Sequence, residues 1–207
     1  DLSKEFKIKK FIYAASGGAS YGEPKENPAK ETTPISPLSP YAVAKHTAEN
    51  YLGVYKYIYG LEWTALRYAN IYGPRQDPHG EAGVVAIFAG NMLKNEVCKI
   101  NGDGSHTRDY LYIKDVVKAN LMAINKKTKH QSFNLGTNVA TSTLEIFETL
   151  KKEINYKKKP IFKPDVPEVV DIRLDFSLAK KELGWSPKIG LKEGIKKTVE
   201  WLKKEMA

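Results

Sequence analysis

Two mostly apolar runs stand out in the first third of the chain, and both predict strands that are buried on both faces. They lie at residues 9–15 and 62–69. Between them, Ser39 and Pro40 predict the start of a helix, and Gly60 predicts its end. The alternation of strand and helix predicts an α/β fold with a mainly parallel, doubly wound sheet.

Beyond residue 73 the pattern becomes shorter and more mixed. Helices are predicted at 84–94, 115–126, 142–154 and 191–205, and a strand at 110–113. Such segments predict a small second lobe packed on the carboxyl edge of the sheet. We therefore divide the chain into residues 1–82 and 83–207, with some segments of the second part returning to the first sheet.

Composition excludes several classes of protein. The chain has 207 residues, of which 42% are hydrophobic, enough for one domain or slightly more. No apolar run reaches the roughly 18 residues of a membrane span, and no signal-peptide core is visible. The single cysteine, Cys98, excludes an internal disulfide and favours the cytoplasm. The four histidines show no metal-ligand spacing, so no metal site is predicted; they are residues 46, 79, 106 and 130.

The net charge of +9 raises the question of nucleic acid, but the lysines are spread along predicted helix faces. This distribution is typical of a solvated surface. The chain has few arginines. We therefore expect them at positions that require the planar guanidinium group, such as a phosphate-binding site. They are Arg67, Arg75, Arg108 and Arg173.

A doubly wound fold normally opens with a strand, a glycine-rich turn and a helix that holds a pyrophosphate. The only glycine-rich candidates here are 16–18 and 101–104, and neither is predicted to open a helix in this way. The chain also starts without a methionine. We therefore expect it to begin within a longer gene product and to lack the phosphate cradle.

Three tyrosines are followed four residues later by a lysine, and geometry separates them. Gly22 and Pro24 oppose a helix between Tyr21 and Lys25, and the pair at 110 and 114 is predicted to lie on a strand. Only Tyr41 and Lys45 lie on a capped helix, with side chains one turn apart.

That pair suits proton transfer. A phenol titrates near pH 10, so a tyrosine base needs roughly 4 kcal/mol of help at neutral pH. One cation roughly 6 Å away supplies only about 2.8 kcal/mol, and a second positive charge, such as an oxidised nicotinamide, would close the gap. Ser16 ends the first predicted strand, where it could hydrogen-bond the same substrate oxygen; alternatively it is only a turn serine.

Taken together, seven segments resemble UDP-glucose 4-epimerases of the extended short-chain dehydrogenase/reductase superfamily, in the family's order. They are FIYAASGGASYG (11–22), SPYAVAK (39–45), LRYANIYGPR (66–75), GVVAIF (83–88), GDG (102–104), TRDYLY (107–112) and LGW (183–185). The resemblance implies that residues 1–82 are the later part of an NAD-binding Rossmann domain and that 83–207 are mainly a nucleotide-sugar-binding lobe.

The resemblance also implies site residues. The catalytic group would be Ser16, Tyr41 and Lys45, and Tyr41 and Lys45 would also contact NAD. Tyr68 and Ala69 would line the nicotinamide pocket. The UDP-sugar would be bound by Ser16 and by a further set: Asn70, Val84, Val85, Arg108 and Tyr110. A strand aromatic such as Tyr110 is more often a core residue, and Arg67 and Arg75 could equally be structural.

The implied reaction is epimerisation at C4 of a UDP-hexose through a transient 4-keto sugar. The loop after Ser16 carries no carboxylate, which fits epimerisation better than the elimination of the related 4,6-dehydratases. Glucose, N-acetylglucosamine and glucuronate remain open as the sugar, and Ile172 lies near the family's gatekeeping position.

One departure concerns the diphosphate. Asp165 stands where the family usually has a phosphate-binding arginine, and it would repel a diphosphate unless Arg173 substitutes. Because the cradle is also missing, we expect that the 207-residue chain alone neither retains NAD nor catalyses. The alternative is a non-catalytic nucleotide-sugar-binding or assembly module.

The predicted helix after Pro40 also carries apolar side chains near one face: Tyr51, Val54, Tyr55 and Ile58. Family members pair such helices, so a homodimer is expected, unless this face packs on the chain's own sheet.

Overall fold

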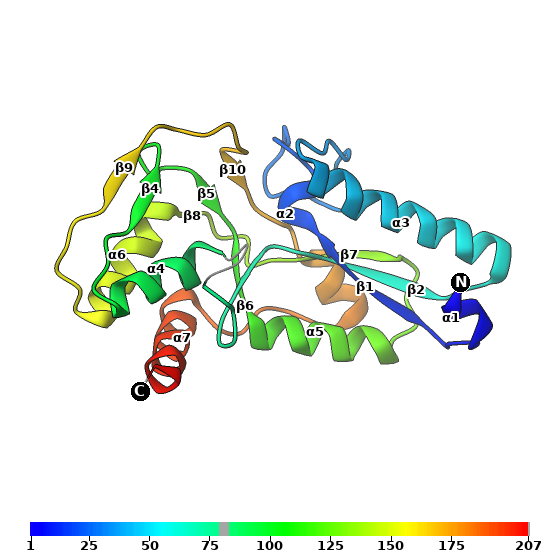
Figure 1. The fold of residues 1–207 in the computed structure, drawn as a ribbon. Coiled ribbons are helices and arrows are strands. Elements are labelled where there is room, and N and C mark those ends of the chain that lie inside the picture. Colours follow the sequence, from blue (N-terminus) through cyan, green and yellow to red (C-terminus); the bar gives the residue numbers. More distant parts are fainter. Residues whose placement is uncertain (79–82, 207) are drawn as a thin grey trace.

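The computed structural model describes residues 1–78 and 83–206 (Figure 1). Its helices are α1 (Leu2–Glu5), α2 (Gly17–Ser20), α3 (Pro40–Tyr59), α4 (Val84–Leu93), α5 (Ile113–Asn125), α6 (Thr143–Ile154), the π-helix η1 (Ala179–Leu183) and α7 (Leu191–Glu205). Its strands are β1 (Phe11–Ser16), β2 (Trp63–Tyr68), β3 (Asn70–Tyr72), β4 (Lys99–Asn101), β5 (Thr107–Arg108), β6 (Tyr110–Tyr112), β7 (Ser132–Leu135), β8 (Thr141–Ser142), β9 (Ile161–Lys163) and β10 (Asp171–Ile172).

The first lobe is built on a parallel sheet with the strand order β1-β2-β7. Helix α3 covers one face of this sheet and α5 covers the other (Figure 1). The register pairs Ser16 with Tyr68, and Tyr68 with Leu135, so the carboxyl ends of the three strands lie side by side. This arrangement confirms the predicted α/β class with a parallel sheet.

Helix α3 begins and ends as its sequence predicts. The Ser39 hydroxyl accepts a hydrogen bond from the Ala42 amide at 3.2 Å, and Pro40 occupies the first turn. At the other end Gly60 takes the left-handed conformation, with φ of 68°, and its amide bonds the Lys56 carbonyl. These two caps determine the residues at which the helix begins and ends.

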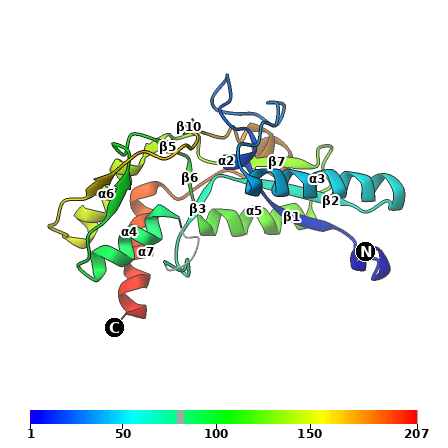
Figure 2. The ribbon, with the colours of Figure 1, turned by 45° about the horizontal axis from the view of Figure 1, so that its top comes forward.

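The second lobe packs α4, α6 and α7 around a separate core, at the end of the molecule away from α1 (Figure 2). Aromatic edges meet there, as between Phe88 and Phe147, whose ring centroids are 6.0 Å apart. The parallel pair β3 and β6 runs between the two lobes.

Several segments of the second half return to the first sheet. Strand β7 pairs with β2, α5 covers a face, and η1 contacts both α5 and β7. The Trp185 indole donates to the Asp115 carbonyl at 2.8 Å and anchors the chain after η1. The proposed division at residues 82 and 83 remains a prediction, because residues 79–82 lie outside the described part.

Two details differ from the sequence prediction. A four-residue helix, α2, begins at Gly17, in a part of the sequence for which no helix was predicted. The chain turns there so close to its neighbours that a Cβ on Gly17 would lie 2.5 Å from Leu174 Cδ1. In addition Lys114 lies on α5 rather than on a strand, because that helix already begins at Ile113.

Candidate active site between the lobes

A cavity of about 380 Å³ opens where β1 and β2 end. Ser16 is the last residue of β1 and Tyr68 the last of β2, and both line the cavity. In open α/β sheets ligands collect at this carboxyl edge. The position of the cavity therefore follows from the topology of the first lobe.

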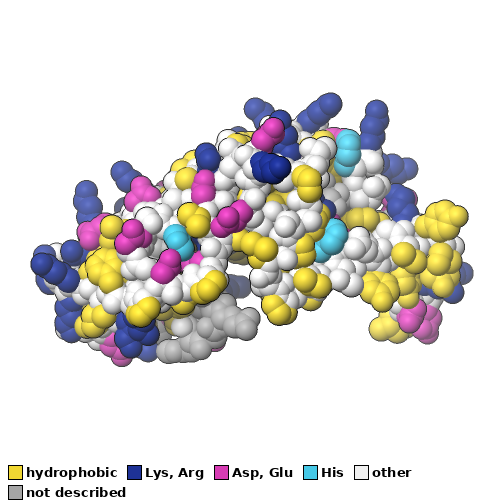
Figure 3. Space-filling view, turned by 90° about the horizontal axis from the view of Figure 1, so that it is seen from above, with side chains coloured by type: hydrophobic (Ala, Val, Ile, Leu, Met, Phe, Trp, Pro, Cys, Tyr) yellow, Lys and Arg dark blue, Asp and Glu magenta, His cyan; other side chains and the backbone are white. Residues whose placement is uncertain are grey.

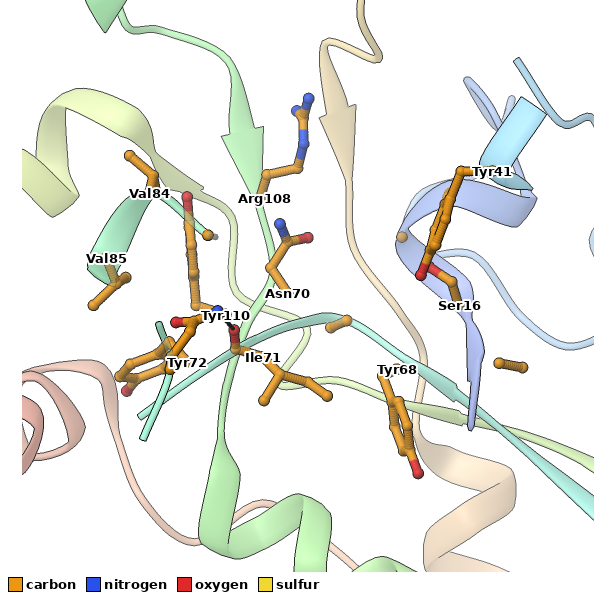
Figure 4. Close-up of a pocket in the computed structure, with 16 residues that line it drawn as sticks. Ser16, Tyr41, Tyr68, Asn70, Ile71, Tyr72, Val84, Val85, Arg108 and Tyr110 are labelled. Carbon is orange, nitrogen blue, oxygen red and sulfur yellow. Dashed lines mark hydrogen bonds between the residues drawn. The ribbon is translucent and has the colours of Figure 1, made fainter. Parts of the chain in front are cut away.

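Ser16 and Tyr41 lie next to each other on one side of the cavity (Figure 4). Tyr41 comes from the first turn of α3, and its side chain is 54% exposed. The Lys45 amine, one turn later, lies 5.7 Å from the Tyr41 ring centroid and donates to the Ala14 carbonyl at 2.9 Å. The ammonium group is thus fixed between β1 and the phenol.

The opposite side is formed by the start of α4 and by β3, β5 and β6 (Figure 4). Every predicted site residue except Lys45 lines this cavity. The lining set that was predicted comprises Ser16, Tyr41, Tyr68, Ala69, Asn70, Val84, Val85, Arg108 and Tyr110. Residues separated by up to 94 positions in sequence therefore meet around one space.

Hydrogen bonds to helix α5 hold the Tyr68 side chain in place. Its hydroxyl contacts the Asn120 side chain on α5 at 2.9 and 3.1 Å, and Asn120 in turn donates to the Val116 carbonyl. Burial raises the pKa of Tyr68, so the ring stays neutral. The Ala69 amide is bound to the Leu135 carbonyl at 2.9 Å.

A second cavity of about 410 Å³ adjoins the first and shares part of its wall. The shared residues are Asn70, Gly83, Val84, Arg108 and Tyr110. Its far side carries charged groups. Arg108 Nη2 is 2.8 Å from Glu168 Oε2, and His106 lies 3.4 Å from Glu168 and 3.7 Å from Asp165.

Tyr110 is a buried wall residue of both cavities. Burial raises its pKa to about 12, against a smaller opposite effect of Arg108. Its neighbour Asp109 is also buried and accepts hydrogen bonds from the backbone of residues 137, 138 and 174. These bonds hold Asp109, the residue between β5 and β6, in place, so that the neighbouring Arg108 and Tyr110 line the cavities.

Some residues with predicted roles lie elsewhere. Arg173 lines neither cavity; its guanidinium contacts Asp171 and the Asn27 carbonyl, each at 3.4 Å. Ile172 is only 1% exposed and pairs with Arg108 as a strand neighbour, so it forms no wall of either cavity. Arg67 uses its fork on Glu49 inside the first lobe.

Sequence reasoning missed other lining residues, chiefly Gln76, His106 and Glu168. Gln76 follows a turn and donates to the Ile71 carbonyl at 3.3 Å. Glu168 reaches Arg108 across 60 positions of sequence, and no short-range pattern signals such a contact.

Within residues 1–78 and 83–206, no group of three His, Cys, Asp or Glu side chains has the arrangement of a metal site. His79, one of the four histidines of the sequence, lies outside the described residues. No helix in the described part is long and apolar enough to cross a bilayer.

Comparison with known proteins agrees with this geometry. Residues 1–136 match the NAD dependent epimerase/dehydratase family. A UDP-glucose 4-epimerase of Mycolicibacterium smegmatis is 44% identical over 199 residues, which cover 95% of this chain and 63% of the relative. The chain thus spans less than two thirds of that relative.

Two solved structures have the same fold. UDP-glucose 4-epimerase of Thermotoga maritima with UDP-glucose is 48% identical, with a TM-score of 0.96, and the match covers 99% of this chain and 67% of that one. The Thermus thermophilus UDP-glucose 4-epimerase in complex with NAD is 39% identical, with a TM-score of 0.87, covering 97% and 66%.

Proposed function

Because the chain belongs to the NAD-dependent epimerase/dehydratase family, we propose that it carries the catalytic group and sugar-nucleotide site of a UDP-hexose 4-epimerase. The observation that carries this proposal is the cavity that brings Ser16 and Tyr41 opposite Asn70 and Arg108. The relatives named as UDP-glucose 4-epimerases favour glucose and galactose as the sugars, and they disfavour the alternative of a non-catalytic module.

In this proposal the hexose lies beside Ser16 and Tyr41. Tyr41 removes the proton of the C4 hydroxyl and later returns it, while the Ser16 hydroxyl hydrogen-bonds the same oxygen. The Lys45 ammonium, 5.7 Å from the phenol ring, stabilises the phenolate form of Tyr41.

NAD would contact Tyr41, Lys45, Tyr68 and Ala69, and when bound it supplies the acceptor and donor of the hydride. Tyr41, Tyr68 and Ala69 face one space at the carboxyl ends of β1 and β2, which fits the nicotinamide end of the cofactor. The UDP moiety would extend across Asn70, Val84 and Val85 toward Arg108.

The side chains that line the first cavity favour epimerisation over elimination. Among the described residues that line the first cavity, none is an aspartate or glutamate. The acid that elimination from a sugar requires has no candidate among those side chains.

A homodimer through α3 belongs to the same proposal. Tyr51, Val54 and Ile58 are 64%, 50% and 58% exposed rather than packed on the chain's own sheet, whereas Tyr55 is half-buried and its hydroxyl donates to Asp1. Figure 3, viewed from the side of α3, shows hydrophobic side chains gathered toward the end of the molecule where α3 ends. A row of exposed apolar side chains of this size favours pairing with a second copy.

We also propose that the 207-residue chain alone neither retains NAD nor catalyses, in keeping with the family's greater length. The test joins this chain to the third of the Thermotoga maritima enzyme that it does not match. The chimaera is expected to interconvert UDP-glucose and UDP-galactose with NAD, and its Tyr41→Phe variant is expected to lose at least about 100-fold in kcat. An inactive, folded chimaera contradicts the proposal, as does micromolar NAD binding by the chain alone.

A further inference from the structure

A buried ion pair joins helix α3 to the sheet. Glu49 on α3 and Arg67 on β2 are only 4% and 7% exposed. Arg67 Nε lies 3.1 Å from both carboxylate oxygens of Glu49, and Nη2 lies 2.8 Å from Oε2. The planar guanidinium therefore binds the carboxylate through two of its nitrogens.

The pair continues into a network that reaches two further segments. The remaining nitrogen of Arg67, Nη1, donates to the Tyr21 hydroxyl at 2.9 Å, and Tyr21 donates to Asn134 on β7 at 2.7 Å. The Ser132 hydroxyl donates to Glu49 at 2.9 Å. Each polar group in the network has a partner, as burial requires.

These segments are the ones that carry the proposed catalytic group. Glu49 follows Lys45 by one helical turn and Tyr41 by two, about 12 Å along α3. Arg67 directly precedes Tyr68 and pairs in register with Ala15, the neighbour of Ser16. Tyr21 follows α2, the short helix that begins after Ser16.

A buried ion pair of this kind adds little to the free energy of unfolding, but it makes one position of α3 on the sheet more favourable than others. Burial alone would lower the pKa of the Arg67 guanidinium, but Glu49 and Tyr21 raise it on balance, so the guanidinium stays charged. Replacing a buried pair by apolar residues is often neutral, whereas separating its partners is costly. A slide or rotation of α3 would separate them.

We propose that Glu49 and Arg67 are positioning residues, whose buried pair sets the register and rotation of α3 that place Tyr41 and Lys45 beside Ser16. This inference rests on the proposed function for its catalytic meaning. The geometric part concerns the chain alone and can be measured without turnover.

The test uses the double variant Glu49→Leu/Arg67→Met in the full 207-residue chain. Its matched control is Lys56→Gln/Glu62→Gln, which removes the exposed 3.2 Å ion pair at the other end of α3. Three quantities are measured: the melting temperature, amide hydrogen exchange in residues 40–48, and the ratio of the affinities for UDP-glucose and UDP by calorimetry.

The double variant is expected to melt near the wild-type temperature and to exchange the amides of residues 40–48 about tenfold faster. UDP affinity is expected to stay unchanged, whereas the UDP-glucose to UDP affinity ratio changes, because only the hexose touches Tyr41. The control keeps both wild-type values. A folded double variant with wild-type exchange and ratio would overturn the inference.

If the double variant does not fold, Arg67→Lys decides. Lysine keeps the charge but lacks the planar fork that holds Glu49 from two nitrogens and Tyr21 from the third, so exchange in residues 40–48 should rise by a smaller factor. Unchanged exchange in this folded variant also overturns the inference. If wild type binds neither UDP nor UDP-glucose, the proposed function fails, and the exchange rates still decide the positioning role.

Discussion

At the scale of single residues, we predict that Asp165 weakens the binding of a diphosphate, because it stands where the family usually has an arginine. It lies 3.7 Å from His106, which lines the second cavity. Asp165→Arg replaces a negative charge by a positive one, so the Kd for UDP-glucose should fall about tenfold at low salt.

Calorimetry at two salt concentrations checks this prediction, because the gain should shrink as salt screens the charge. Glu153→Arg, an exposed position on α6, makes the same change of charge far from Asp165 in sequence and serves as the control. Equal gains in both variants would mean that only net charge matters.

The burial of Tyr110 is predicted to make the free energy of unfolding depend on pH. Its pKa is raised from 10.0 to about 12, so between these values the unfolded chain releases a proton that the folded chain keeps. The contribution of Tyr110 to the free energy of unfolding is therefore unchanged well below pH 10 and falls as pH rises toward 12. The fall amounts to about 1 kcal/mol between pH 9 and pH 11.

Urea unfolding of Tyr110→Phe should show a correspondingly smaller loss over this pH interval than wild type does. Tyr57→Phe, at a side chain that is 91% exposed, controls for removal of a hydroxyl group. Identical pH slopes in wild type and Tyr110→Phe would contradict the burial argument.

At the scale of elements, two helical glycines are predicted to respond in opposite ways to alanine. A Cβ on Gly53 in α3 meets nothing within 4 Å, so Gly53→Ala should stabilise by about 0.5–1 kcal/mol. A Cβ on Gly194 in α7 would lie 2.1 Å from the Tyr72 hydroxyl, so Gly194→Ala should cost about 1–3 kcal/mol. Urea midpoints of both variants test the packing of α7 against Tyr72 on β3, and equal shifts would contradict it.

The predictability of each element depended on whether its cause was local. Helix α3 could be predicted at both ends, because Ser39, Pro40 and Gly60 act on neighbouring backbone. Helix α2 was not predicted, and the close approach of Gly17 to the distant Leu174 is a tertiary contact that no local pattern signals. The same distinction holds at the site: strand ends and helical spacing predicted Ser16 and Tyr41, whereas the pairing of Arg108 with Glu168 depends on tertiary folding.

At the scale of the whole molecule, the exposed face of α3 predicts self-association. Sedimentation velocity should give twice the 23.3 kDa mass of one chain. Val54→Asp should shift the species to monomer because it places a charge in the apolar face, whereas Val139→Asp should not, since Val139 lies away from α3 in sequence; the two valines are 50% and 57% exposed. A monomeric wild type would contradict the proposed pairing.

The two lobes both contribute to the site, since the first supplies Ser16 and Tyr41 and helix α4 of the second supplies Val84 and Val85. A UDP-sugar that spans this cavity has to touch both lobes. Binding of the intact ligand therefore tests the arrangement of the whole molecule rather than of one loop.

The most direct measurement is a calorimetric titration of the chain with UDP-glucose, run beside Arg108→Ala and beside Arg173→Ala, an arginine that lines neither cavity. We predict saturable binding of one ligand per chain, weakened at least about tenfold by Arg108→Ala and unchanged by Arg173→Ala. Absence of binding to the folded chain, or equal affinities in all three proteins, would contradict the assignment of this cavity to a UDP-sugar.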